Sequence, residues 1–366
     1  MRFIAISLAF ILASLQPVSA KGCDVDEASP VLTLIMVTYT PNDPWMTGVV
    51  RFARAAAVSY GFRFEVLNLS PEEAAGMAAL ETHVAEYQPK AAVVVTQMTY
   101  AAQLVRYLDS EGVFTGFAIT PLSDVNYALT GNPKQKYPYY VVHVVPDDER
   151  AGYDLANILL DEARRRDIEP PIRIVGISGE GINPVSIARS KGLRRAVEEA
   201  SDAELIQIAY ANWSPIVAAQ KARMMSIRYG KVDVLWAAND TMALAAMDMI
   251  DRREGVVVGG YDWTDPARKL MEEGYYAASL GGHNADVALA IGILVDHVLK
   301  RAAPRRPSES QFVSALSPLR RENIVQYERL LNELDNCETD FPAAFGVPVI
   351  VPEGGLETAS LLMGRE

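Results

Sequence analysis

The most constraining feature of this sequence is a regular alternation of short apolar runs with longer amphipathic segments. VLTLIMVTY (31–39) is a near-continuous apolar run, which is typical of a strand that is buried on both faces of a sheet. Residues 47–61 follow, with apolar side chains at helical spacing and a glycine at the end. Because strands and helices alternate in this way, the chain is expected to form parallel sheets built from right-handed crossovers.

The alternation divides into two series, each with four or more strands. A chain of 366 residues is long enough for two domains, and two doubly wound α/β lobes fit this pattern better than one very large sheet. The strands are expected at 31–39, 62–69, 91–96 and 113–120, and then at 139–145, 172–178, 205–211, 232–238, 256–262 and 275–282. A helix at 284–300, the Pro-rich stretch RAAPRRP and a final helix over 317–334 are too few elements for a third domain.

The amino terminus predicts an exported protein. Met1 and Arg2 precede the apolar run FIAISLAFILASL, and small residues end at Ala20, so residues 1–20 resemble a signal peptide that is cleaved after Ala20. Lys21 and Gly22 do not fit a lipoprotein signal ahead of Cys23. In an oxidising compartment, Cys23 and Cys337 are expected to form a disulfide, with two free thiols as the alternative.

Signals of enzymes and of nucleic-acid binding are weak throughout the sequence. A net charge of −12 argues against a nucleic-acid partner, because binding a nucleic acid requires a basic surface. The four histidines show no metal-ligand spacing, and the chain has no GxSxG, GxxxxGK[ST] or GxGxxG motif in a suitable place. We therefore expect no catalytic residues, no cofactor and no metal, with an exported α/β hydrolase as the remaining enzymatic alternative.

Polar and aromatic residues stand at the carboxyl ends of six expected strands, which is where open α/β sheets bind ligands. Any one of them could simply be a helix cap, as Asp240 could be before Thr241. Carboxylates, amides and guanidinium groups bind hydroxyls, and aromatic rings stack on the C–H faces of a small ring. The candidates for such a polyhydroxylated ligand are Asn42, Asp43, Trp45, Gln97, Arg189, Trp213, Asn239, Asp240, Tyr261, Asp262 and His283.

These segments resemble the type 1 periplasmic binding proteins, which include ribose- and galactose-binding proteins and the autoinducer-2 receptor. The resemblance covers roughly residues 31–300 and rests on four motifs in order: NDPWM, SIARSKGL, AANDTMALAAMDMI and VVVGGYDWTDPA. It implies ligand contacts for Arg189, for Asn239 or Asp240, and for Tyr261 and Asp262. Within the Asn239–Asp240 pair, we expect one residue to cap the following helix and the other to face the ligand.

The sequence departs from this family at two places. Many sugar-binding members have a glutamine where this chain has Gly282, followed by His283 and Asn284. An Asp-Arg pair that follows the fourth strand in the family is replaced here by Ile119-Thr120-Pro121. Both changes remove groups that bind sugars, so the ligand is not expected to be a common pentose or hexose.

The resemblance implies two lobes that close on a ligand by a hinge motion. The first lobe is expected to comprise 31–145 and 283–305, and the second 146–282 and 310–345, with RAAPRRP at a crossing and 346–366 as a loosely held tail. The leading hypothesis is a monomeric periplasmic receptor that delivers its ligand to an inner-membrane ABC permease. The alternative is a sensory receptor that reports to a membrane sensor kinase.

Overall fold

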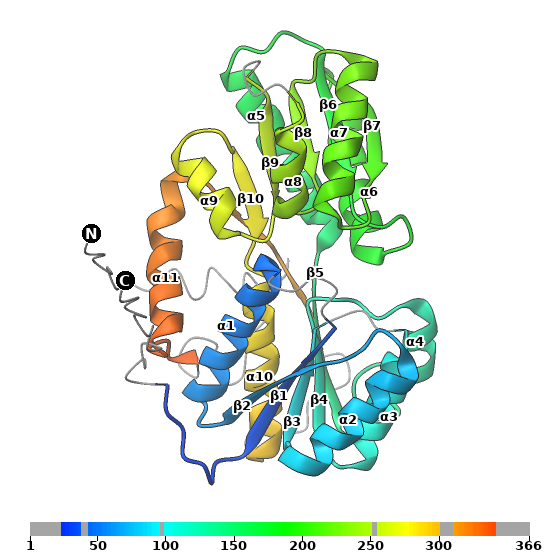
Figure 1. Ribbon diagram of the computed structural model, residues 1–366, viewed down its shortest axis with the longest axis vertical. Helices are drawn as coiled ribbons and strands as arrows, with labels where there is room; N and C mark the ends of the chain where they lie inside the picture. Colours follow the sequence, from blue (N-terminus) through cyan, green and yellow to red (C-terminus); the bar gives the residue numbers. More distant parts are fainter. Residues whose placement is uncertain (1–22, 38–42, 96–98, 251–254, 301–309, 342–366) are drawn as a thin grey trace, which may run out of the picture.

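The computed structural model describes residues 23–37, 43–95, 99–250, 255–300 and 310–341, which form two α/β lobes one above the other (Figure 1). Both lobes are doubly wound parallel sheets, as the alternation predicted. The expected signal peptide, the RAAPRRP crossing and the expected tail lie outside the described residues. None of the described helices combines the length and apolar character required to cross a bilayer.

The first lobe is a six-stranded sheet in the order β11-β5-β4-β3-β1-β2. Helices α1 and α10 pack on one face, while α2 and α3 pack on the other. Every residue of β1 is buried, which explains the near-continuous apolar run with which the first series begins. The elements are β1 (Val31–Met36), α1 (Pro44–Ser59), β2 (Arg63–Asn68), α2 (Glu73–Tyr87), β3 (Ala91–Val94), α3 (Ala101–Ser110), β4 (Phe114–Ala118), α4 (Asp124–Thr130), β5 (Tyr140–Pro146), α10 (Asn284–Val298) and β11 (Gln311–Ser314).

The second lobe is a six-stranded sheet in the order β12-β10-β9-β8-β6-β7. All neighbouring strands are parallel except β12, which pairs antiparallel with β10. Helices α5 and α6 pack together on one face, and α7 and α8 pack together on the other. The elements are α5 (Asp148–Arg165), β6 (Ile172–Ser178), α6 (Pro184–Glu199), β7 (Ala203–Tyr210), α7 (Pro215–Tyr229), β8 (Val234–Ala237), α8 (Asp240–Met247), β9 (Val257–Tyr261), α9 (Asp265–Glu272), β10 (Ala278–Gly281) and β12 (Ser317–Leu319).

Three segments of chain cross between the lobes. They join β5 to α5, β10 to α10, and β11 to β12. The first and third crossings are held together because the backbone N–H of Asp147 donates to the carbonyl oxygen of Ser314 at 2.8 Å. The hydroxyl of Ser314 in turn donates to Asp286 in the first turn of α10, at 2.5 Å. These contacts bring the three crossings into one group between the lobes.

The segment after residue 310 is divided between the lobes, whereas the sequence analysis expected it to pack mainly on the second. Its first strand, β11, extends the first sheet beside β5, and only β12 joins the second. The final helix, α11, spans Ile324–Asp335 and therefore begins later than the expected Ser317. Strands of three and four residues are too short for an alternating pattern to be recognised in the sequence.

Candidate functional site

The first lobe contributes the amino-terminal end of α1. Asp43 is the N-cap residue, and its Oδ1 accepts a hydrogen bond from the backbone N–H of Trp45 at 2.9 Å. Pro44 occupies the first helical turn, where its missing N–H removes no helical hydrogen bond. This arrangement fixes Trp45 at the start of the helix, with its side chain partly exposed.

Trp45 contacts the crossing between β10 and α10. Its indole Nε1 donates a hydrogen bond to Nε2 of His283 at 3.0 Å, and the two rings lie at 29° with their centroids 6.3 Å apart. Because Nε2 accepts this bond, the neutral imidazole must carry its proton on Nδ1. Nδ1 is buried and has no hydrogen-bond partner among the described residues. His283 therefore holds a donor that is available to a ligand or a water molecule.

The second lobe contributes Asp262, which follows β9 directly. Its Oδ1 lies 3.4 Å from Nε2 of His283. Because that nitrogen already accepts a hydrogen bond from Trp45, no hydrogen bond joins His283 to Asp262, but the three side chains bring the first lobe, the crossing and the second lobe side by side. Burial, and next the negative charge of Asp262, raise the pKa of Asp43. The two lobes thus each place a carboxylate beside the same crossing.

The backbone at Asp262 is held in an unusual conformation by the residue that follows. Asp262 and Trp263 both have positive φ angles, 99° and 55°, which residues other than glycine rarely adopt. The indole Nε1 of Trp263 donates to the carbonyl oxygens of Ser279 at 2.9 Å and Ser317 at 3.1 Å. Its ring lies so close to Gly281 that a Cβ there would be 2.6 Å from it. The buried Trp263 therefore fixes the turn that presents Asp262.

Arg189, in α6, is 4% exposed and links four elements of the second lobe. Its Nε donates to Asp148 at 2.8 Å, its Nη1 donates to the carbonyl oxygen of Ala238 at 2.7 Å, and its guanidinium lies 4.2 Å from the centre of the Tyr261 ring. Nη2 makes no hydrogen bond to a described residue. Arg189 is thus positioned at the crossing by Asp148, and one of its nitrogens remains available.

Asp148 was not among the residues predicted for the site. It lies in the segment PDDER (146–150), which directly follows β5. An acidic residue at a crossing between lobes is a signal that could have identified the partner of Arg189. The pair is almost fully buried, because each side chain is 5% exposed.

Asn239 and Asp240 divide their tasks differently from the sequence expectation. Asn239 is the cap: its Oδ1 accepts from the backbone N–H of Met242 at 2.8 Å, and the residue stays partly exposed. Asp240 is fully buried and faces the interior of the second lobe. Its two oxygens accept four hydrogen bonds, at 2.8–3.1 Å, from the backbone N–H and hydroxyl of Thr264 and the hydroxyls of Tyr276 and Ser279.

The remaining candidates are Tyr261, Trp213, Asn42 and Gln97. Tyr261 is fully buried, and its hydroxyl donates to the carbonyl oxygen of Ala151 at 3.1 Å beneath Arg189. Trp213 is partly exposed and packs against Gly179, which directly follows β6. Asn42 and Gln97 lie outside the described residues.

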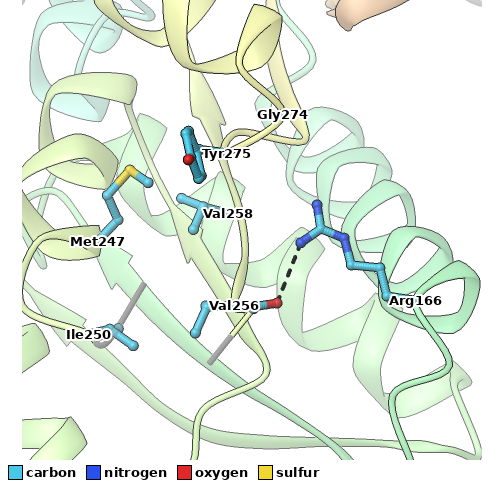
Figure 2. Close-up of a pocket in the computed structure, with 8 residues that line it drawn as sticks. Arg166, Met247, Ile250, Val256, Val258, Gly274 and Tyr275 are labelled. Carbon is cyan, nitrogen blue, oxygen red and sulfur yellow. Dashed lines mark hydrogen bonds between the residues drawn. The ribbon is translucent and has the colours of Figure 1, made fainter. Parts of the chain in front are cut away.

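A separate pocket of about 220 Å³ lies in the second lobe, at the amino ends of β9 and β10 and thus away from the crossings (Figure 2). Its lining is mainly apolar, and its one charged residue, Arg166, already donates to the carbonyl oxygen of Gly255 at 3.4 Å. Among the described residues, no cluster of His, Cys, Asp and Glu side chains suits a metal ion. The candidate site is therefore the group of polar residues around the crossings.

Comparison with known proteins shows the family of this chain. The model of the periplasmic binding protein domain family matches residues 34–300, and the chain belongs to that family of solute-binding proteins. The D-allose-binding periplasmic protein of Escherichia coli (strain K12) is 26% identical over 222 residues, which cover 54% of this chain and 70% of that protein.

Solved structures share the fold. A solute-binding protein from Actinobacillus succinogenes 130z with bound D-allose superposes with a TM-score of 0.70 at 17% identity, covering 82% of this chain and 100% of that one. The myo-inositol binding protein of Caulobacter, bound to myo-inositol, has a TM-score of 0.65 at 18% identity, with 84% and 99% covered. These similarities do not favour the sensory-receptor alternative.

Proposed function

We propose that this protein is an exported solute-binding protein that captures a small, polyhydroxylated ligand for an ABC importer. The observation that carries the proposal is the proximity of Trp45, His283 and Asp262, which come from the first lobe, a crossing and the second lobe. A ligand held at this place contacts both lobes at once. The related proteins named for D-allose and myo-inositol support a sugar or a cyclic polyol as the ligand class.

The proposed ligand contacts are an aromatic face and a set of directional polar groups. The indole of Trp45 covers a C–H face of the ligand ring, while Asp43 and Asp262 accept hydrogen bonds from its hydroxyls. Nδ1 of His283 and Nη2 of Arg189 donate, since neither has a partner among the described residues. Asp240 and Tyr261 act indirectly, because both are buried beneath this surface with partners of their own.

The charges of these residues favour a ligand without negative charge. The charge of Asp262 helps to raise the pKa of Asp43, and Arg189 is already paired with Asp148. A sugar acid or sugar phosphate would add a further anion beside two carboxylates. We therefore assign neutral sugars and polyols to this site rather than their acidic derivatives.

Capture in this proposal occurs by closure of the lobes about the three crossings. A ligand that contacts both lobes stabilises the closed arrangement by as much as it binds that arrangement more tightly than the open one. Residues 1–20 direct the chain to the periplasm. There the inner-membrane permease recognises the closed form. The protein itself makes and breaks no bond of the ligand.

The test is calorimetric titration of the purified mature protein with D-allose, D-ribose, myo-inositol and D-glucuronate. We expect micromolar or tighter binding of at least one neutral compound and no binding of the acid. Ligand at 100 times its dissociation constant should also raise the free energy of unfolding by about 2.7 kcal/mol. Binding of D-glucuronate alone, or of no sugar or polyol in a wider panel, would overturn the proposal.

A further inference from the structure

Helix α11 runs along one side of the molecule and lies beside both lobes (Figure 1). Its inward face is apolar, with Ile324, Tyr327, Leu330, Leu331 and Leu334 buried, and the rest of the helix is largely polar and exposed. In Figure 1 the helix begins next to α9 of the second lobe and ends next to α1 of the first. It therefore spans the boundary that the three crossings also span.

The first half of α11 is attached to the second lobe. The hydroxyl of Tyr327 donates to the carbonyl oxygen of Trp263 at 3.3 Å, and the Tyr327 ring packs edge-on against the Trp263 ring, with 5.0 Å between their centroids. Glu328 forms an ion pair with Arg268 of α9. Trp263 is also the residue that fixes the turn at Asp262, so this attachment reaches the candidate site directly.

The end of α11 is attached to the first lobe. Asp335 lies 2.7 Å from Nε of Arg51 in α1, and the backbone N–H of Phe341 donates to the hydroxyl of Ser59 at 3.2 Å. A disulfide joins Cys337 to Cys23, as the sequence analysis expected. Cys23 lies eight residues before β1 begins at Val31, so the covalent bond ties the end of α11 to the first sheet.

We propose that α11 is a strut between the lobes, which limits how far the cleft opens in the absence of ligand. The contacts at both ends of the helix exist in the arrangement of lobes seen here, and a wider opening must stretch or break one set of them. They therefore stabilise this arrangement relative to more open ones. The inference rests on the hinge motion of the proposed function.

The position of the strut also gives the hinge a direction. The three crossings run through the middle of the molecule and α11 lies along one side, whereas α4 and α6 lie on the opposite side in Figure 1. With one side tied, the lobes separate at the side of α4 and α6. An unliganded protein that is kept partly closed loses less free energy to closure, so the strut strengthens ligand binding.

The experiment is small-angle X-ray scattering of the unliganded protein, which needs no knowledge of the ligand. The first-lobe attachment is released by the triple change Cys23→Ser, Cys337→Ser and Asp335→Asn. The second-lobe attachment is released by Tyr327→Ala with Glu328→Gln. Arg268→Gln breaks only the ion pair of this attachment and leaves α11 unchanged. Gln326→Ala is the matched control, because Gln326 is exposed on the same helix. Circular dichroism confirms that each variant is folded.

We expect release of either attachment to increase the radius of gyration by roughly 0.5–1 Å from about 20 Å, with no change for Gln326→Ala. Because a strut fails when either end is free, releasing both ends should give the same increase as releasing one. An unchanged radius in all variants would overturn the proposal, and so would increases that add. Either result leaves ligand binding, and hence the proposed function, to be judged separately by calorimetry.

Discussion

Asp240 and Asp262 follow neighbouring strands of the same sheet, at the same edge, yet their surroundings differ completely. Asp240 is fully buried, and its oxygens accept four hydrogen bonds from within the second lobe. Asp262 is 8% exposed and approaches only His283 among the contacts described above. The comparison shows that position at a strand end does not make a carboxylate a ligand group. A carboxylate can bind a ligand only if its oxygens are still able to accept hydrogen bonds.

The largest effect is expected when Asp240 is replaced by alanine. The substitution leaves the hydroxyls of Tyr276 and Ser279 and the N–H of Thr264 without their acceptor inside the lobe. Each buried donor without a partner costs about 1–3 kcal/mol, so the free energy of unfolding should fall by about 4 kcal/mol. Chemical denaturation of the whole protein would measure this loss of stability. A loss below about 1 kcal/mol would contradict the structural role of Asp240.

The titration of Asp240 makes the same role visible through pH. Burial, and next the charge of Asp262, raise the pKa of Asp240 to about 7, although the hydrogen bonds from Thr264, Tyr276 and Ser279 oppose this shift. The folded protein therefore binds a proton between about pH 4 and pH 7 that the unfolded chain, with the ordinary carboxylate pKa, releases. The stability that this proton contributes is complete below pH 4 and is lost as the pH rises through 7.

Denaturation of the wild type and of Asp240→Asn across this range tests the expectation. The amide does not titrate, so the wild type should lose free energy of unfolding relative to Asp240→Asn as the pH rises from 4 to 7. One proton corresponds to a slope of at most about 1.4 kcal/mol per pH unit. Parallel pH profiles for the two proteins would show that Asp240 stays ionised in the fold.

Asp262 should behave in the opposite way. Replacing it with alanine removes a proposed ligand acceptor but leaves no buried donor of its own lobe without a partner. We expect ligand affinity to fall at least 100-fold, about 2.7 kcal/mol, while stability changes by less than about 1 kcal/mol. Asp265→Ala is the matched control, since Asp265 is an exposed carboxylate three residues further along the chain. Calorimetric titration with a ligand that the wild type binds measures the affinity, and thermal unfolding measures the stability. Retained affinity in Asp262→Ala would place the site elsewhere.

Much of the fold could be predicted because the hydrophobic pattern has a period. Strands such as β1 are buried on both faces and helices such as α1 bury one side, so the spacing of apolar residues along the chain indicates which residues are buried. The short strands β11 and β12 escaped prediction because three or four residues do not establish a period. Their position depends on pairing with distant strands, which local sequence does not encode.

The candidate site was predicted less completely, for a related reason. The sequence identified Arg189, Asp262 and Trp45 as polar or aromatic residues at strand ends, but it could not separate Asp240 from them. That distinction depends on partners 24 to 39 residues further along the chain. Asp148 was not predicted, because its role depends on Arg189, which lies 41 residues further along the chain. Motifs indicate where a site lies, whereas long-range hydrogen bonds decide which of its residues are available.

The smallest expected effect separates the polar and apolar contributions of Trp45. Trp45→Phe keeps an aromatic face but removes the Nε1 hydrogen bond to His283, whose Nε2 is then free to take up the proton. The imidazole can donate from Nε2 to Asp262, 3.4 Å away, and that bond competes with the ligand for the carboxylate. We expect affinity to fall about fivefold, which is about 1 kcal/mol, whereas Trp45→Ala should lose the stacking surface as well. If calorimetry gave equal losses for the two variants, the hydrogen bond to His283 rather than the ring face would be the essential contribution of Trp45.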